Sequence, residues 1–103
     1  METGQVYFIL QTSVETNEQF YKIGFSIDPA KRLRELKTGN PNILELKYTI
    51  FDVPMSFEKH MHGVCERYRV DGEWFKKEVL DFLMKESSPW FRENILRYSK
   101  KSS

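Results

Sequence analysis

The sequence contains a single cysteine, Cys65, in 103 residues. One thiol excludes an internal disulfide and a zinc site made of several thiolates, and it is typical of a reducing compartment. Because Cys65 falls on the apolar stripe of a predicted helix, we expect it to pack in the core. No apolar run approaches the length of a membrane span, and the first residues lack the basic and apolar regions of a signal peptide. We therefore expect an intracellular protein, cytoplasmic or nuclear, that binds no membrane.

The chain also lacks an excess of either charge, since 16 Lys and Arg face 15 Asp and Glu, for a formal net charge of +1. This total is uninformative, because a near-neutral protein can still present a basic face to phosphates, although its non-specific hold on nucleic acid should be weak and sensitive to salt. The distribution of charge is more informative, because one short segment gathers four basic residues, Lys31, Arg32, Arg34 and Lys37. This cluster either contacts nucleic-acid phosphates or belongs to a solvated, mixed-charge surface.

The hydrophobic fraction of 40% and the aromatic fraction of 15% predict one folded domain, residues 1–98, followed by a polar tail, residues 99–103. Alternating apolar residues predict strands, and apolar spacings of three and four predict helices. We expect strands at 5–10, 19–25 and 43–51, and helices at 30–37, from Ser56 onward, at 76–85 and at 90–98. This order predicts an α+β fold with a small three-stranded, largely antiparallel sheet flanked by helices.

Two of these elements carry specific local signals. Asp28 followed by Pro29 predicts a helix start, because Asp accepts backbone N–H bonds and Pro fits the first helical position. Gly39 is expected to end that helix, since glycine adopts the left-handed conformation without strain. In the strand at 43–51, the side chains of one face are predicted to be Leu44, Leu46, Tyr48 and Ile50.

Five short motifs follow one another along the chain. They are Tyr21-Lys22-Ile23-Gly24, Asp28 to Leu36, Thr38-Gly39-Asn40-Pro41, Glu58-x-x-x-His62 and Gly72-Glu73-Trp74-Phe75. In this order and spacing they resemble the GIY-YIG nuclease superfamily. The closest likeness is to its branch of phage-type DNA-binding domains and meiotically up-regulated fungal gene products. The resemblance spans roughly residues 5–80, and it implies a compact α+β nuclease fold.

The resemblance implies roles for single residues. Tyr7 matches the last residue of the first motif, Arg32 the arginine that contacts the scissile phosphate, and Glu58 the carboxylate that binds one Mg²⁺ or Mn²⁺ ion. Lys22 stands where the superfamily has its second tyrosine, and Tyr21, one residue away, should face the other side of the sheet. The asparagine near the end of many members has no counterpart. These two departures leave open a domain that binds DNA without cleaving it.

The acidic and imidazole groups also have structural interpretations. Glu58 binds the metal ion by resemblance, but a glutamate two residues after a Ser56 cap is also stabilised by the helix dipole. His62 lies one turn later on the same face, where it can orient that carboxylate, contact phosphate or transfer a proton. It can equally complete the packing beside Met61. We expect His60 to be a surface residue.

The basic and aromatic residues have two interpretations as well. Arg32 either binds a phosphate bidentately or pairs with a nearby acid. Lys22 contacts phosphate, acts as a base, or extends to solvent at a sheet edge. Tyr7 either relays a proton or is a core aromatic with a bonded hydroxyl. The rings of Trp74 and Phe75 are expected in the core.

The sequence thus predicts a divalent-metal-dependent DNA endonuclease that hydrolyses phosphodiester bonds. Its predicted catalytic residues are Tyr7, Lys22, Arg32, Glu58 and His62, its DNA contacts are Lys31, Arg32, Arg34 and Lys37, and its metal ligand is Glu58. The expected substrate is duplex or branched DNA, reached as a homodimer or through a targeting partner. The first alternative is a non-catalytic or weakly catalytic DNA-binding module with the same fold, and the second is a protein-interaction domain that uses exposed Trp90 and Phe91. Glu73 can line the edge of the active-site cleft, and its role is left open.

Overall fold

Three long antiparallel strands form the centre of the molecule. The computed structural model describes residues 2–99. β1 (Thr3–Thr12) turns back into β2 (Gln19–Ser26), and β3 (Ile43–Pro54) pairs with the other edge of β1. These are the strands that the alternation of apolar residues predicts, and each is longer than expected.

Three short strands extend this sheet to six within residues 2–99. β4 (Arg69–Asp71) and β5 (Trp74–Lys76) form a hairpin that pairs with β2, and β6 (Leu96–Arg97) pairs with β3. The strand order is β4-β5-β2-β1-β3-β6, with every pair antiparallel. The fold is α+β, but the predicted three-stranded sheet is wrong. Strands of two or three residues are too short to show a periodic pattern, so they are revealed only by their pairing.

Helical segments fill the connections between the strands. They are α1 (Pro29–Lys37), α2 (Ser56–Val64) with a 3₁₀ turn at Glu66–Tyr68, α3 (Val79–Asp81) with a π-helical turn at Phe82–Glu86, and α4 (Pro89–Asn94). The helix expected at 76–85 begins later because its first residue belongs to β5. The helix expected at 90–98 ends at Asn94 because the chain then joins the sheet as β6.

The start of α1 follows its local signals, whereas the start of α2 does not. An Asp28 carboxylate oxygen accepts the Lys31 backbone N–H at 3.1 Å, and Gly39 after the helix has a φ of +73°. These observations confirm the predicted limits of α1. In α2 the residue before the helix is Met55, which makes no side-chain capping bond. The predicted Ser56 cap is therefore wrong.

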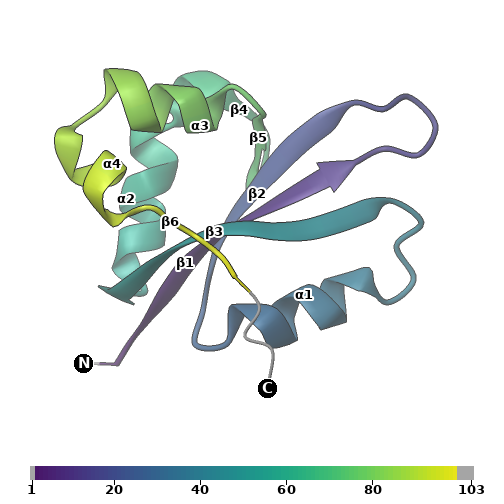
Figure 1. Cartoon of the computed structure of the whole chain (residues 1–103), viewed down its shortest axis with the longest axis horizontal. Helices are drawn as coiled ribbons and strands as arrows, with labels where there is room; N and C mark the ends of the chain where they lie inside the picture. The colour runs from purple at the N-terminus through teal and green to yellow at the C-terminus, as the bar shows by residue number, and fades with distance from the viewer. Residues whose placement is uncertain (1, 100–103) are drawn as a thin grey trace.

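The sheet has helices on both of its sides (Figure 1) and separates two apolar clusters. On one side α2, α3 and α4 pack over a face that carries Phe8, Tyr21 and Ile23. On the other side α1 packs over a smaller face that carries Tyr7 and Ile9. Tyr21 therefore points away from Tyr7, as strand alternation predicts.

A bulge in β3 changes which residues face α1. In β1, Phe8 pairs with Tyr48 but its neighbour Ile9 pairs with Leu46, so Lys47 is an extra residue. An extra residue reverses the alternation of side chains along a strand. The leucines before the bulge pack with α1, whereas Tyr48 and the isoleucine two residues later pack on the other side. The prediction of one shared face is therefore wrong.

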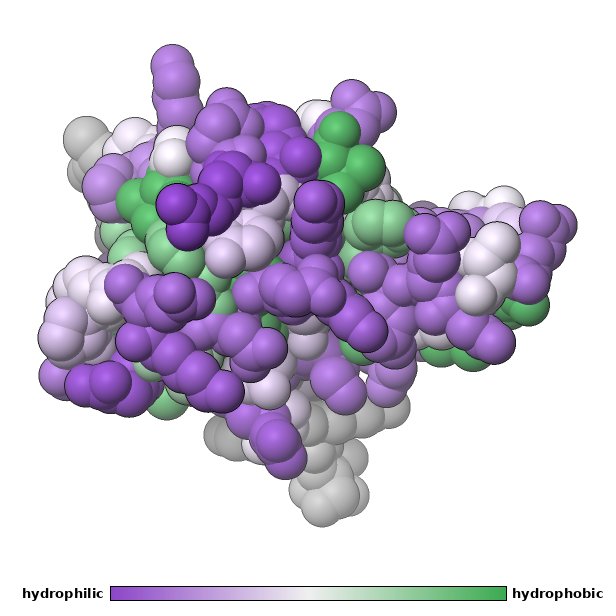
Figure 2. Space-filling model, turned by 90° about the horizontal axis from the view of Figure 1, so that it is seen from above, coloured by the Kyte–Doolittle hydropathy of each residue, from purple (hydrophilic) through white to green (hydrophobic). Residues whose placement is uncertain are grey.

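The surface is mainly hydrophilic. Seen from above, Figure 2 shows polar residues over most of the molecule, with hydrophobic residues in small patches between them. Within residues 2–99, no helix combines the length and apolar character needed to cross a bilayer. Of the predicted polar tail, residues 100–103 lie outside the described part of the chain.

Candidate functional site

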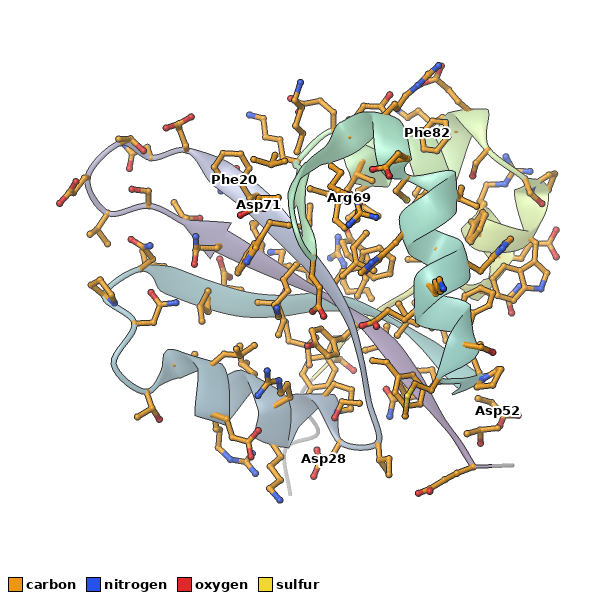
Figure 3. The ribbon with its side chains drawn as sticks, turned by 180° about the vertical axis from the view of Figure 1, so that it is seen from behind. Phe20, Asp28, Asp52, Arg69, Asp71 and Phe82 are labelled. Carbon is orange, nitrogen blue, oxygen red and sulfur yellow. The ribbon has the colours of Figure 1, made fainter. Side chains whose placement is uncertain are left out.

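The outer edge of β2 loses its strand partner part-way along. β5 pairs only with the stretch of β2 from Phe20 to Lys22. Beyond that point, backbone N–H and C=O groups need other partners, because unpaired backbone groups are costly where water is excluded. The N–H of Ile23 donates to the Glu73 carbonyl at 3.0 Å. Side chains of α2 take over from there, and Figure 3 shows β2 passing between α1 and α2.

His62 of α2 bonds directly to this edge. Its Nε2 lies 2.8 Å from the Ile23 carbonyl oxygen, and its ring packs on Phe75 with 5.2 Å between centroids. A carbonyl only accepts hydrogen bonds, so Nε2 carries the proton that is donated. In the neutral ring, Nδ1 therefore keeps a lone pair that can accept a proton.

Glu58 lies one turn before His62 in the first turn of α2 and is half-buried. Burial raises the pKa of its carboxyl above the ordinary value, and the charge of Glu73 raises it further. His62, the backbone N–H of Phe25 and Lys22 act in the opposite direction. The carboxylate is therefore held beside the β2 edge at an electrostatic cost, and a cation placed next to it would relieve that cost.

Lys22 and Glu73 form an ion pair at the end of β5. Lys22 Nζ lies 3.0 Å from Glu73 Oε1 and 5.3 Å from the centroid of the Trp74 ring. The Lys22 side chain is only 13% exposed, whereas that of Glu73 is 42% exposed. Because Lys22 pairs with Ile9 across the sheet, it belongs to the face covered by α1.

Tyr7 lies on the same face, directly opposite Gly24 of β2. A Cβ atom at Gly24 would collide with the Tyr7 hydroxyl and ring, so the ring occupies the space that a side chain would need. Tyr7 is 2% exposed. Burial raises the pKa of its phenol, and the guanidinium of Arg32 beside its hydroxyl opposes that rise. The same contact with Tyr7 is the main cause that raises the pKa of Arg32.

Arg32 itself is exposed on α1 and makes a second contact within the helix. Its Nη1 lies 3.4 Å from Glu35 Oε1, with both side chains roughly half exposed. An ion pair so open to water stabilises little, about 0.2–1 kcal/mol. Arg32 therefore lies beside Tyr7, with nearly half of its side chain open to solvent.

These groups lie around β2 and share one surface. The charges of Glu73, Arg32 and Glu58 all act on the Tyr7 hydroxyl. Those of Glu73 and Lys22 act on Glu58. The structure thus brings together two cations, two carboxylates, a phenol and an imidazole. We call this group the β2-edge site, and its members are Tyr7, Lys22, Arg32, Glu58, His62 and Glu73.

A family model, the T5orf172 domain, matches residues 4–91 of the chain. The chain belongs to the T5orf172 domain family. The assignment corrects the resemblance drawn from the five motifs, because T5orf172 is a different family from GIY-YIG, although some of its members are described as GIY-YIG-like. None of the curated proteins matches the chain, and none of the solved structures does.

T5orf172 domains are nuclease-like and DNA-binding domains. The matched residues of this T5orf172 domain include every member of the β2-edge site and end before β6. The remaining basic residues of α1, namely Lys31, Arg34 and Lys37, are solvent-exposed. His60 is exposed as expected, and Cys65 is fully buried, with burial raising the pKa of its thiol to about 12.

Glu73 is the member of the site whose role the sequence left open. Its neighbours Trp74 and Phe75 directly precede the helix expected at 76–85, but they form β5 together with Lys76. The register of β5 against β2 pairs Lys22 with Trp74, so the residue just before Trp74 arrives beside the lysine. An available signal was the Asp71-Gly72 turn, which is typical of a hairpin.

Proposed function

We propose that this T5orf172 domain hydrolyses phosphodiester bonds of DNA with the help of one Mg²⁺ or Mn²⁺ ion. The observation that carries the proposal is the meeting of two cations, a half-buried carboxylate, a phenol and an imidazole at the β2-edge site. Phosphodiester hydrolysis needs charge neutralisation on the phosphate, a proton acceptor for water and help for the leaving oxygen. The site offers side chains for each task.

In this proposal Arg32 and Lys22 bind the phosphate. Arg32 is suited to a bidentate contact, and Lys22 supplies a compact charge at the sheet surface. Tyr7, fixed between Gly24 and Arg32, orients the phosphate or the attacking water through its hydroxyl. The free Nδ1 of His62 accepts a proton from that water.

Glu58 is the residue that would hold the ion. Within residues 2–99, no three His, Cys, Asp or Glu side chains form a group able to hold a metal. A single carboxylate, that of Glu58, does not suit zinc. It fits Mg²⁺ or Mn²⁺, which can retain several waters and need only one or two carboxylates. When bound, the ion would supply Lewis-acid stabilisation of charge on the phosphate oxygens.

Nicking of supercoiled plasmid and of branched DNA tests this proposal. We expect cleavage in Mg²⁺ or Mn²⁺ that EDTA abolishes and that Glu58→Ala reduces at least about 100-fold, the scale of losing one electrostatic element of a site. Glu15→Ala, an exposed glutamate in the loop between β1 and β2, is the matched control and should cut normally. Cleavage that survives in EDTA, or that continues at the wild-type rate in folded Glu58→Ala, would refute the proposal.

The second candidate is a T5orf172 domain that binds DNA without cutting it. A specific observation favours it, namely that Lys31, Arg34 and Lys37 of α1 are solvent-exposed and can contact phosphates whether or not the β2-edge site cleaves them. Salt-sensitive binding without any product would support it. The protein-interaction alternative gains less from the structure, because Phe91 is 6% exposed and Trp90, at 41%, packs against Phe57 and Phe91.

A further inference from the structure

Lys22 is the least exposed cation among the ion pairs of residues 2–99. Its ammonium group touches the Glu73 carboxylate and lies over the Trp74 ring. A cation so largely removed from water needs an anionic partner, because desolvation disfavours an uncompensated charge. In the free protein that partner is Glu73, although Lys22 is also the cation proposed to bind phosphate.

Glu73 is built to release Lys22 without disturbing the fold. Its backbone carbonyl is fixed by the Ile23 N–H at 3.0 Å, and the preceding Gly72 forms the turn with a φ of +53°. Its side chain is nevertheless 42% exposed. The carboxylate can therefore rotate into water while the backbone stays in place. The negative charge of Glu73 also raises the pKa of both Tyr7 and Glu58, which places it at the same surface.

We propose that Glu73 occupies, in the free protein, the position on Lys22 that a DNA phosphate takes in the complex. Glu73 is then a positioning residue that keeps Lys22 aligned and makes every phosphate compete with an internal carboxylate. A DNA phosphate also gains Arg32 and neighbouring contacts and displaces Glu73, whereas a small free anion gains little from the exchange. This inference rests on the phosphate-binding part of the proposed function.

The direct test is DNA binding by Glu73→Gln, measured by fluorescence anisotropy on a short duplex over a range of salt concentrations. We expect binding that is roughly two- to fivefold tighter, the scale of one partly exposed ion pair. The slope of log affinity against log salt should steepen by up to about 0.9, because one more uncompensated cation meets a phosphate. A merely structural glutamate would change stability without changing that slope.

Two further variants locate the effect. Glu35→Gln removes the carboxylate beside Arg32, in a pair whose arginine is 44% exposed, and should change affinity less than Glu73→Gln. In a Lys22→Met background, Glu73→Gln should no longer tighten binding, which a double-mutant cycle measures as a coupling between the two residues. Thermal melts of each variant establish that it is folded.

Inorganic phosphate separates this inference from the proposed nuclease activity. Phosphate, compared with chloride at equal ionic strength, should raise the melting temperature of Glu73→Gln more than that of the wild type. If no variant nicks DNA but this difference and the tighter DNA binding are found, the nuclease proposal fails and the inference stands. Weaker or unchanged DNA binding by Glu73→Gln would overturn it, as would tightening that persists in Lys22→Met.

Discussion

Tyr7 and Gly24 occupy one shared space in the sheet, because the tyrosine ring lies where a side chain of residue 24 would be. That arrangement aims the Tyr7 hydroxyl at Arg32. Gly24 does not have a positive φ. Glycine is therefore needed here to let the Tyr7 ring come close, and not for an unusual backbone conformation. The orientation of Tyr7 in the site therefore depends on an absent side chain.

Gly24→Ala should destabilise the protein by about 1–3 kcal/mol, because the new methyl group displaces a buried aromatic ring. Urea unfolding measures the change. Gly63→Ala is the matched control, since a Cβ at that exposed position of α2 meets nothing within 4 Å. The control should be neutral or more stable by about 0.5–1 kcal/mol, as expected for replacing a helical glycine. Equal stabilities of Gly24→Ala and the wild type would contradict the close contact.

Tyr21, on the opposite face, predicts a dependence of stability on alkaline pH. Burial, with smaller effects of nearby Tyr48, Asp81 and Glu45, raises its pKa from 10.0 to about 12. Between those values the unfolded chain loses the phenolic proton and the folded chain keeps it. The free energy of unfolding should therefore fall as pH rises from 10 to 12, by at most about 3 kcal/mol from this residue. Below pH 10 it should not depend on Tyr21 ionisation.

Tyr21→Phe removes this ionisable group. Denaturant unfolding at a series of pH values should show a smaller loss of stability for the variant than for the wild type above pH 10. Identical slopes for the two proteins would contradict the raised pKa.

Among the elements, α1 carries Arg32 to the site, and its first turn depends on Asp28. Asp28→Ala should cost about 1 kcal/mol of stability, because the Lys31 N–H loses the carboxylate that accepts it. Asp28→Asn preserves an acceptor and should remain close to the wild type. Chemical denaturation compares the three proteins, and equal losses in both variants would indicate that charge matters more than capping.

The elements that the sequence predicts are those whose signals are local. β1, β2, β3 and α1 carry their own alternation or capping residues, so their positions follow from short stretches of chain. The short strands depend on partners far along the sequence, as β5 depends on β2. The bulge at Lys47 is equally non-local, because it is defined by the register of β3 on β1.

The same distinction applies to the candidate site. Motif spacing placed Arg32 and the α2 pair, Glu58 and His62, on helices near the end of β2. It could not place Glu73, whose position follows from β-hairpin pairing. The roles assigned to these residues remain predictions, and the nicking and binding experiments above test them.

At the scale of the whole molecule, a net charge of +1 means that binding to DNA must come from local arrangement. In the proposed function, two cations of the β2-edge site and three exposed basic residues of α1 would provide it, without a strongly basic surface elsewhere being required. The family assignment also depends on most of the chain, since the T5orf172 match extends over residues 4–91. Five short motifs agreed in order with a related kind of domain but did not identify the family.

The strand order also determines which strands are open to pairing with other chains. In the described chain, the outermost strands are β4 with three residues and β6 with two, and the ten- and twelve-residue strands lie inside. Long bare strands at a sheet margin recruit other chains and seed aggregates, whereas such brief ones give an incoming chain little to extend. Within residues 2–99, β6 pairs with only Tyr48 and Thr49 of β3, so detachment of Leu96 and Arg97 would remove the one short strand that covers the middle of this twelve-residue strand.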